Sequence, residues 1–197
     1  TSNLYVGGGV QVALSFINEL NNINAKNNYH IFISKTIKDQ IDQHIFSNKF
    51  KFYFIPKSPS HLVERLKTVK FLSSLEREII PDVVFTVFGP SYWKPKVPHI
   101  MGFANGWLYN PMSIAYTKLT LFNRVRVRVF CWYQEYYLKR DANFFIVETL
   151  DAKSKLSMVS SIDVNKIAVV GNTCSSIFDD RKYIDRDFEH YISLPKK

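Results

Sequence analysis

The sequence predicts an α/β fold, a Rossmann-like and mostly parallel sheet with helices on both faces. Short apolar runs of strand length alternate with segments of helical periodicity along the chain. One run, residues 82–88 (DVVFTVF), is apolar almost throughout, as expected for a strand that is covered on both faces. Alternation of this kind joins parallel strands through right-handed crossovers.

The first elements follow three consecutive glycines. Apolar residues recur at helical spacing across Val10–Leu20, and this helix is expected to end in the polar run 21–28. Residues 29–34 (YHIFIS) and 50–55 (FKFYFI) are expected to be strands, and the second is rich in aromatic side chains. Between them, residues 35–44 have a weak helical pattern.

The clearest helical pattern precedes Pro81. Ser58 is a suitable N-cap, Pro59 suits the first helical position, and Pro81 ends the helix. The apolar residues at helical spacing that define its buried face are Leu62, Leu66, Val69, Leu72, Leu75 and Ile79.

Two strands are expected next, at residues 82–88 and 97–104, before a segment with two interpretations. Residues 124–130 (RVRVRVF) alternate in polarity, which favours a strand. Residues 113–140 are nevertheless predicted to be helical, because a single helical stripe accounts for more of their apolar residues. That stripe consists of Leu121, Val125, Val129, Trp132 and Tyr136.

A strand at 143–148, a helix at 149–160 and a strand at 166–171 complete the predicted fold. We therefore expect one Rossmann-like domain over residues 1–178. The polar, aperiodic remainder, residues 179–197, is expected to be a truncated linker toward an absent C-terminal domain.

The composition restricts the possible partners. A formal net charge of +9 on 197 residues favours an anionic partner, such as nucleic acid, anionic lipid or a phosphorylated ligand. No apolar run is long enough for a membrane-spanning helix, and no signal peptide is visible. The two cysteines, Cys131 and Cys174, lack metal-binding spacing and are expected to be ordinary buried residues in a reducing compartment.

The glycines Gly7, Gly8 and Gly9 have two interpretations that the residues alone leave open. Backbone N–H groups without side-chain cover at the start of a helix can hold a diphosphate. The same residues also suit a tight strand-to-helix turn without a ligand. Gln11 and Val12 do not fit the patterns of dinucleotide-binding or ATP-binding loops, which disfavours both classes.

Four blocks of the chain resemble, in this order, the N-terminal half of glycosyltransferase family 4 enzymes, which have the GT-B fold. They are YVGGGVQVALSFINEL (5–20), PDVVFTVFGPSYWKPKVPHIMGFANGW (81–107), FFIVETLDAKSKL (144–156) and KIAVVGNTCSSIF (166–178). The resemblance implies that two Rossmann-like domains face each other across a cleft. The N-terminal domain would hold the acceptor, and the C-terminal domain would hold the nucleotide-sugar donor.

The resemblance and the strand ends together give a substrate-binding set. The glycine loop would lie near the donor's diphosphate and the transferred sugar, with Val10 and Gln11 at the helix start. Asn105 and Glu148 follow strands and are candidates for hydrogen bonds to sugar hydroxyls, although a turn residue and a helix cap are alternative roles. The set is therefore Gly7, Gly8, Gly9, Val10, Gln11, Asn105 and Glu148.

Two features depart from the family pattern. Only Leu4–Val6 precede the glycines, so the central first strand is expected to be missing or replaced by another segment. Many family members carry a histidine at the place that matches Ala104–Asn105. Here His99 lies within the expected strand instead, where a packing role is the more common one. The catalytic residues stay unidentified.

Residues 118–140 combine six basic residues with interleaved aromatic side chains and one acidic residue, Glu135. Such a helix can lie on an anionic membrane surface, with Arg124, Arg126 and Arg128 as candidate contacts. A solvated basic face above a buried aromatic stripe is the alternative and the commoner arrangement. Nothing in the chain resembles a nucleic-acid-binding module, so no nucleic-acid partner is expected.

We expect the acceptor-side domain of a sugar-nucleotide-dependent, retaining glycosyltransferase that acts in bacterial surface polysaccharide or glycolipid synthesis. The alternative is a non-catalytic carbohydrate-binding or anionic-membrane-binding module. No metal or other cofactor is expected, since the resemblance implies a metal-independent reaction. The nucleotide sugar is a substrate bound mainly by the absent domain, so residues 1–197 alone are expected to be inactive. The expected location is cytoplasmic, peripherally at the inner face of the membrane.

Overall fold

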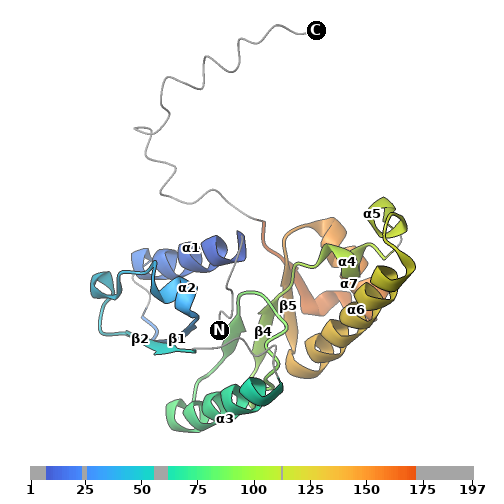
Figure 1. Ribbon diagram of the computed structural model, residues 1–197. Coiled ribbons are helices and arrows are strands. Elements are labelled where there is room, and N and C mark those ends of the chain that lie inside the picture. The colour runs from blue at the N-terminus through green and yellow to red at the C-terminus, as the bar shows by residue number, and fades with distance from the viewer. Residues whose placement is uncertain (1–7, 24–25, 56–61, 112, 172–197) are drawn as a thin grey trace, which may run out of the picture.

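The computed structural model describes residues 8–23, 26–55, 62–111 and 113–171. Within these ranges it confirms the predicted α/β fold (Figure 1). Short parallel strands form two sheets, and helices pack on both faces of the layer.

Every strand that the sequence predicts is present, although the hydrogen-bonded part is shorter than the apolar run. The strands are β1 (Tyr29–Ile33), β2 (Phe50–Phe54), β3 (Val84–Thr86), β4 (His99–Gly102), β5 (Phe144–Val147) and β6 (Ile167–Val169). One sheet contains β1 and β2, and the other has the order β3-β4-β5-β6. All neighbouring strands are parallel, which confirms the predicted crossovers.

The helices also follow the predicted order. They are α1 (Gly8–Asn22), α2 (Lys35–Lys38), α3 (Leu62–Ile79), α4 (Gly106–Tyr109), α5 (Ile114–Thr117), α6 (Leu121–Asp141) and α7 (Leu150–Ser160), with 3-10 turns η1 (Gln43–Ile45) and η2 (Val164–Lys166). The ambiguous segment is therefore helical rather than a strand, as predicted, but the single helix expected over residues 113–140 is divided into α5 and α6. The sequence did not predict α4. The Thr120 hydroxyl caps α6 by accepting a hydrogen bond from the Asn123 N–H at 3.4 Å. The weak pattern over residues 35–44 produces only α2 and the start of η1.

Two clusters of apolar side chains hold the two sheets in one layer. On one face, α1 packs against Ile33 of β1 and against Val87, which follows β3. On the other face, Leu72 of α3 packs with Phe32 of β1 and with Trp93. Because Phe32 and Ile33 are neighbours in a strand and point to opposite sides, α1 and α3 cover opposite faces.

The division between the two sheets falls between β1 and β3, where the sequence predicts a missing central strand. Leu4–Val6, which precede the glycines, lie outside the described residues. The same is true of Ser58 and Pro59 at the predicted start of α3, of Cys174 and of the predicted linker.

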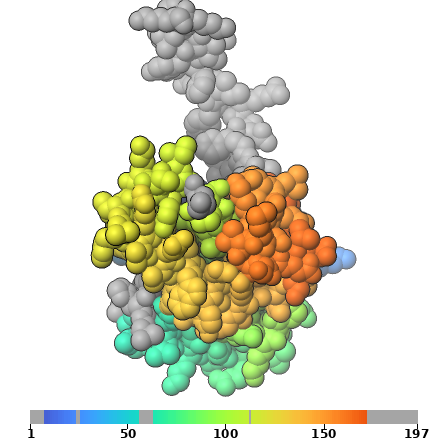
Figure 2. Space-filling model, turned by 90° about the vertical axis from the view of Figure 1, so that its right-hand side faces the viewer, coloured from blue at the N-terminus to red at the C-terminus, as the bar shows by residue number. Residues whose placement is uncertain are grey.

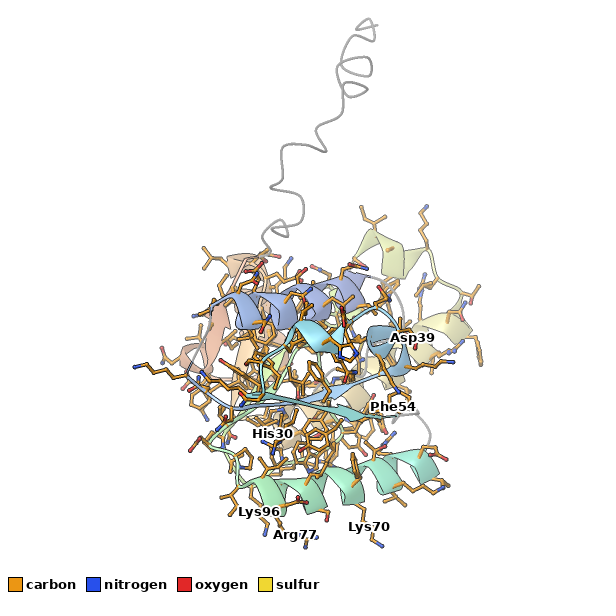
Figure 3. The ribbon with its side chains drawn as sticks, turned by 90° about the vertical axis from the view of Figure 1, so that its left-hand side faces the viewer. His30, Asp39, Phe54, Lys70, Arg77 and Lys96 are labelled. Carbon is orange, nitrogen blue, oxygen red and sulfur yellow. The ribbon has the colours of Figure 1, made fainter. Side chains whose placement is uncertain are left out.

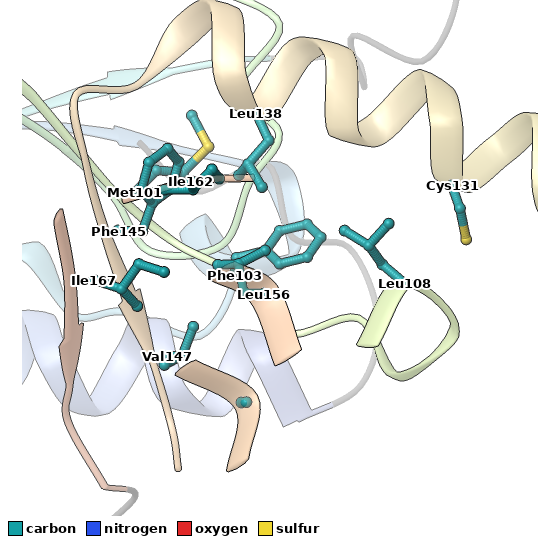
Figure 4. Close-up of a cluster of buried hydrophobic side chains, with 11 residues drawn as sticks. Met101, Phe103, Leu108, Cys131, Leu138, Phe145, Val147, Leu156, Ile162 and Ile167 are labelled. Atoms are coloured by element: carbon teal, nitrogen blue, oxygen red, sulfur yellow. The ribbon is translucent and has the colours of Figure 1, made fainter. Parts of the chain in front are cut away.

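The β4-β5-β6 half of the larger sheet has its own core (Figure 4). Leu138 of α6 and Leu156 of α7 converge with Phe103, which directly follows β4, and none of the three is more than 1% exposed. Val147 of β5 and Ile167 of β6 complete this cluster. The core fixes α6 and α7 against the strands whose ends form the candidate site.

One face of α3 differs from its prediction. Leu72 is buried, but Leu66 is 65% exposed. At that turn of the helix the neighbouring Arg65 takes the buried position, because its guanidinium donates hydrogen bonds to the hydroxyls of Tyr133 and Tyr137 on α6. The helical period was predicted correctly, but Arg65 rather than Leu66 lies in the interface between α3 and α6.

Candidate functional site

The carboxyl ends of the strands meet at one edge of the larger sheet, because all strands are parallel. β4 ends at Gly102 and leads through Asn105 into α4, while β5 ends at Val147 and leads through Glu148 into α7. The N-terminal end of α1 lies beside this same edge (Figure 1). Ligands of open α/β sheets bind at such edges, so the candidate site is built here.

The described glycines form the first turn of α1. Gly8 is exposed, and a Cβ added to it would meet nothing within 4 Å. Gly9 is half-buried and Gln11 is exposed, whereas Val10 is 3% exposed and packs in the core. Gly7 lies outside the described residues. The side chain of Val10 therefore serves the fold, and the uncovered main chain of Gly8 is the part that a ligand can approach.

Asn105 is held by the local fold. Its side-chain oxygen accepts a hydrogen bond from the Trp107 N–H at 2.9 Å and so caps α4. Its side-chain amide donates to the side-chain oxygen of Gln134 on α6. The alternative role as a turn residue is therefore realised, and Asn105 ties α4 to α6.

Glu148 is half-buried at the end of β5 and is not the cap of α7. That cap is Thr149, whose hydroxyl accepts a hydrogen bond from the Ala152 N–H at 3.0 Å. The Tyr109 hydroxyl donates to the carbonyl oxygen of Phe103. Burial, and to a smaller extent the charge of Glu148, raises the pKa of Tyr109.

An apolar cavity of about 190 Å³ lies beside this edge, between α4, α6 and α7. Its walls include Trp107, Leu108, Val127, Cys131, Trp132 and Val159, with Arg128 and Glu135 as charged members. Cys131 is buried as predicted, and burial followed by the nearby Glu135 charge raises the pKa of its thiol. The sequence did not predict this cavity, because its walls come from elements that are separate in the chain. The one available signal was the presence of large apolar side chains, Trp107 and Trp132, in two of these elements.

A second cavity, of about 370 Å³, lies at the opposite edge, where β4 and β5 begin. Lys94, Lys96 and Lys139 line it together with the Arg140–Asp141 pair. The Arg140 Nε atom lies 2.5 Å from Asp141 Oδ1, while Asp141 Oδ2 is buried and has no hydrogen-bond partner among the residues that the structure describes. Burial raises the pKa of Asp141, and the hydrogen bond from Arg140 opposes that rise. The sequence contained the cations but gave no sign that they surround a carboxylate.

His99 is completely buried within β4, as its position in the predicted strand indicated. Its ring lies between Thr86 and the backbone of Asp141, away from the carboxyl edge. The packing role is therefore confirmed. Trp93, which lies between β3 and β4, is also buried, and its indole N–H donates to the Ser73 hydroxyl at 3.1 Å.

The three candidate arginines of α6 have different surroundings. Arg124 donates to the backbone carbonyls of Leu119 and Thr117, which fixes the turn before α6. Arg126 and Arg128 are exposed. The alternative of a buried aromatic stripe holds for part of this helix: Tyr133 and Tyr137 are half-buried and contact Arg65 of α3, whereas Trp132 and Tyr136 are at least 53% exposed.

Comparison with known proteins adds no assignment. No protein-family model matches the chain, and no curated protein matches it. In the part of the chain that the structure describes, no helix has the length and apolar character needed to cross a bilayer. The same residues contain no group of three or more His, Cys, Asp or Glu side chains that could hold a metal ion.

Proposed function

We propose that this chain is the acceptor-side domain of a retaining, sugar-nucleotide-dependent glycosyltransferase of bacterial surface polysaccharide or glycolipid synthesis. The observation that carries the proposal is the uncovered main chain of Gly8 at the start of α1, beside the carboxyl edge of the parallel sheet. The resemblance of four ordered sequence blocks to family 4 glycosyltransferases supports the choice of reaction.

The first turn of α1 has the chemistry that a diphosphate requires. The first N–H groups of a helix have no partner within the helix, and the aligned peptide dipoles place a partial positive charge at that end. Without a Cβ at Gly8, phosphate oxygens can reach the main chain. The donor's diphosphate would therefore contact the start of α1 while a second domain holds the nucleotide.

The edge next to α1 offers groups for the acceptor. The Glu148 carboxylate can accept hydrogen bonds from sugar hydroxyls, and Trp107, which is 37% exposed, offers an aromatic face for a sugar ring. The apolar cavity behind them suits the hydrocarbon part of a glycolipid acceptor. Because the substrate is a nucleotide sugar, the reaction belongs in the cytoplasm.

A binding experiment tests the role of α1 directly. Amide chemical shifts of the 197-residue chain are followed during titration with uridine diphosphate, UDP-glucose and GDP-mannose. The Gly8→Asp variant places a carboxylate where the diphosphate would lie, yet an acidic residue at a helix N-terminus favours helix stability. Loss of binding in this variant would therefore not reflect unfolding.

The Gly106→Asp variant is the matched control, since Gly106 is also an open first residue of a helix. We expect the ligands to change the amide chemical shifts at the start of α1 in the parent chain and in Gly106→Asp but not in Gly8→Asp. If none of the three ligands changes the amide chemical shifts of α1 in the parent chain, the proposal is contradicted. Sugar transfer catalysed by this chain alone would contradict the assignment of donor binding to a second domain.

A further inference from the structure

The outward side of α6 is apolar from Leu121 to Tyr136. Six of its residues are between 53% and 78% exposed: Leu121, Phe122, Val125, Val129, Trp132 and Tyr136. We call this set the α6 face. Leu121 and Phe122 are adjacent, and the other members follow at intervals of three or four residues, so that the set lies on one side of the helix. Figure 2 shows α6, in yellow to gold, on the surface that faces the viewer.

The α6 face is opposite the side that holds the helix to the protein. Cys131 and Leu138 point into the core and are at most 9% exposed. A surface helix normally buries its apolar side and presents polar residues to water. In α6 both sides carry apolar residues, so the outward side needs an explanation other than the core.

The charges beside the α6 face are positive. At 100° per residue, Arg128 falls on one flank of the apolar arc and Arg126 on the other. The acidic residues of α6 are compensated: Glu135 pairs with Lys139 at 2.6 Å, and Asp141 is buried beside Arg140. An apolar arc between two exposed arginines has the pattern of a helix that lies in the plane of an anionic membrane surface.

Aromatic residues support this choice of partner. Trp132 and Tyr136 belong to the α6 face, and tryptophan and tyrosine favour the boundary between headgroups and acyl chains. Trp132 and Arg128 also line the apolar cavity, so the α6 face continues into a hollow that a hydrocarbon chain can enter. A second copy of the chain fits less well, since pairing two such faces would bring their arginines together.

We propose that the α6 face docks this protein on an anionic phospholipid bilayer, with the helix axis parallel to the membrane. The apolar side chains enter the boundary of the acyl region, while Arg126 and Arg128 contact lipid phosphates. This inference does not depend on the glycosyltransferase assignment, because the exposed apolar residues and the two arginines of α6 carry it, and the apolar cavity is the one feature that it shares with the proposed function.

Vesicle co-sedimentation of the full 197-residue chain tests the proposal. The vesicles are phosphatidylcholine alone and phosphatidylcholine with phosphatidylglycerol, each at low and high salt. We expect binding only to the anionic vesicles, and less binding at high salt. The Arg126→Glu/Arg128→Glu variant is expected to bind at least about tenfold more weakly.

Matched controls separate the α6 face from general charge and hydrophobicity. Lys70→Glu/Arg77→Glu makes the same charge change on α3, where both side chains point away from the helix into solvent (Figure 3). Val125→Ser/Val129→Ser removes apolar surface from the α6 face, and Leu150→Ser/Met158→Ser removes it from α7, where both residues are at least 76% exposed. Only the two α6 variants are expected to lose binding.

Two results would overturn the proposal. One is that the parent chain does not bind anionic vesicles, or that Lys70→Glu/Arg77→Glu weakens this binding as much as Arg126→Glu/Arg128→Glu does. The other is a concentration-dependent dimer, seen by sedimentation velocity, that the α6 variants dissociate without any change in vesicle binding. Circular dichroism melts confirm that each variant is folded before binding is compared.

Discussion

The Thr86 hydroxyl lies 2.8 Å from Nε2 of His99, inside the core between β3 and β4. On the other side of the ring, Nδ1 lies 2.6 Å from the carbonyl oxygen of Asp141. A carbonyl oxygen only accepts, so Nδ1 carries a proton and donates it. Burial lowers the pKa of His99, so the ring is neutral at pH 7 and Nε2 accepts from Thr86. The imidazole joins β4 to β3 and to the end of α6.

This arrangement makes folding stability depend on pH. Burial lowers the pKa of His99 to about 4, from an ordinary value of 6.5. Between these values the unfolded chain binds a proton that the folded chain does not. The contribution of His99 to the free energy of unfolding is therefore fully present above pH 6.5 and is lost as the pH falls toward 4. This lowers the free energy of unfolding by about 3 kcal/mol.

Urea unfolding at pH 7 and at pH 4.5 measures this effect. The His99→Gln variant is expected to show a smaller loss of stability between the two pH values than the parent chain does. His44→Gln, at an exposed position of η1, is expected to keep the parent's pH dependence. Equal pH dependence in His99→Gln and the parent would mean that His99 is not the responsible group.

Gly102 allows close approach of β4 to the chain that follows β3. A Cβ at this position would lie 1.9 Å from the Val87 carbonyl oxygen, which is backbone and cannot rotate away. We expect Gly102→Ala to lower the free energy of unfolding by about 1–3 kcal/mol, the range for overpacked positions. Gly106→Ala is the control, because a Cβ there meets nothing within 4 Å. Similar stabilities of the two variants would refute the steric explanation.

Ile80 occupies a left-handed conformation, with φ of 50°, at the end of α3. A β-branched residue is strained there, and the side chain is 79% exposed, so it contributes little burial in return. Ile80→Gly is expected to stabilise the protein by about 1 kcal/mol, measured by thermal unfolding. Val83→Gly, at another partly exposed position, should not stabilise. A lower melting temperature for Ile80→Gly would contradict the expectation.

Arg65 connects α3 to α6 through aromatic partners. It is 8% exposed, its guanidinium carbon lies 4.4 Å from the centre of the Tyr92 ring, and it donates to the Tyr137 hydroxyl at 3.0 Å. Arg65→Ala is expected to cost about 3 kcal/mol, from the lost charged hydrogen bonds and the lost cation–π contact. Arg65→Lys should recover only part of this, because an ammonium lacks the planar fork.

Chemical denaturation measures both Arg65 variants, with Lys67→Ala on the exposed side of α3 as the control. A change below about 0.5 kcal/mol in Arg65→Ala would place this residue among ordinary surface positions. Since Tyr133 and Tyr137 belong to α6, the same contact also fixes how α6 presents its outward side.

The candidate site was predictable only in part. The sequence placed Gly8, Asn105 and Glu148 after or beside strand ends, and parallel strands bring those ends to one edge. It did not reveal that Thr149 rather than Glu148 caps α7, because the choice between neighbouring caps depends on the backbone angles at the helix start. Nor did it reveal the apolar cavity, whose walls depend on how α4, α6 and α7 pack.

The sequence by itself determined the order and type of the strands and of the long helices α1, α3, α6 and α7, because the period of apolar residues is a local property of the chain. It also determined which side chains of α6 share a side. Only the tertiary structure decided that this side faces outward and that Arg65, rather than Leu66, occupies the interface of α3. Periodicity specifies which residues lie together on a helix, whereas burial depends on which other elements cover them, and those elements are distant in the sequence.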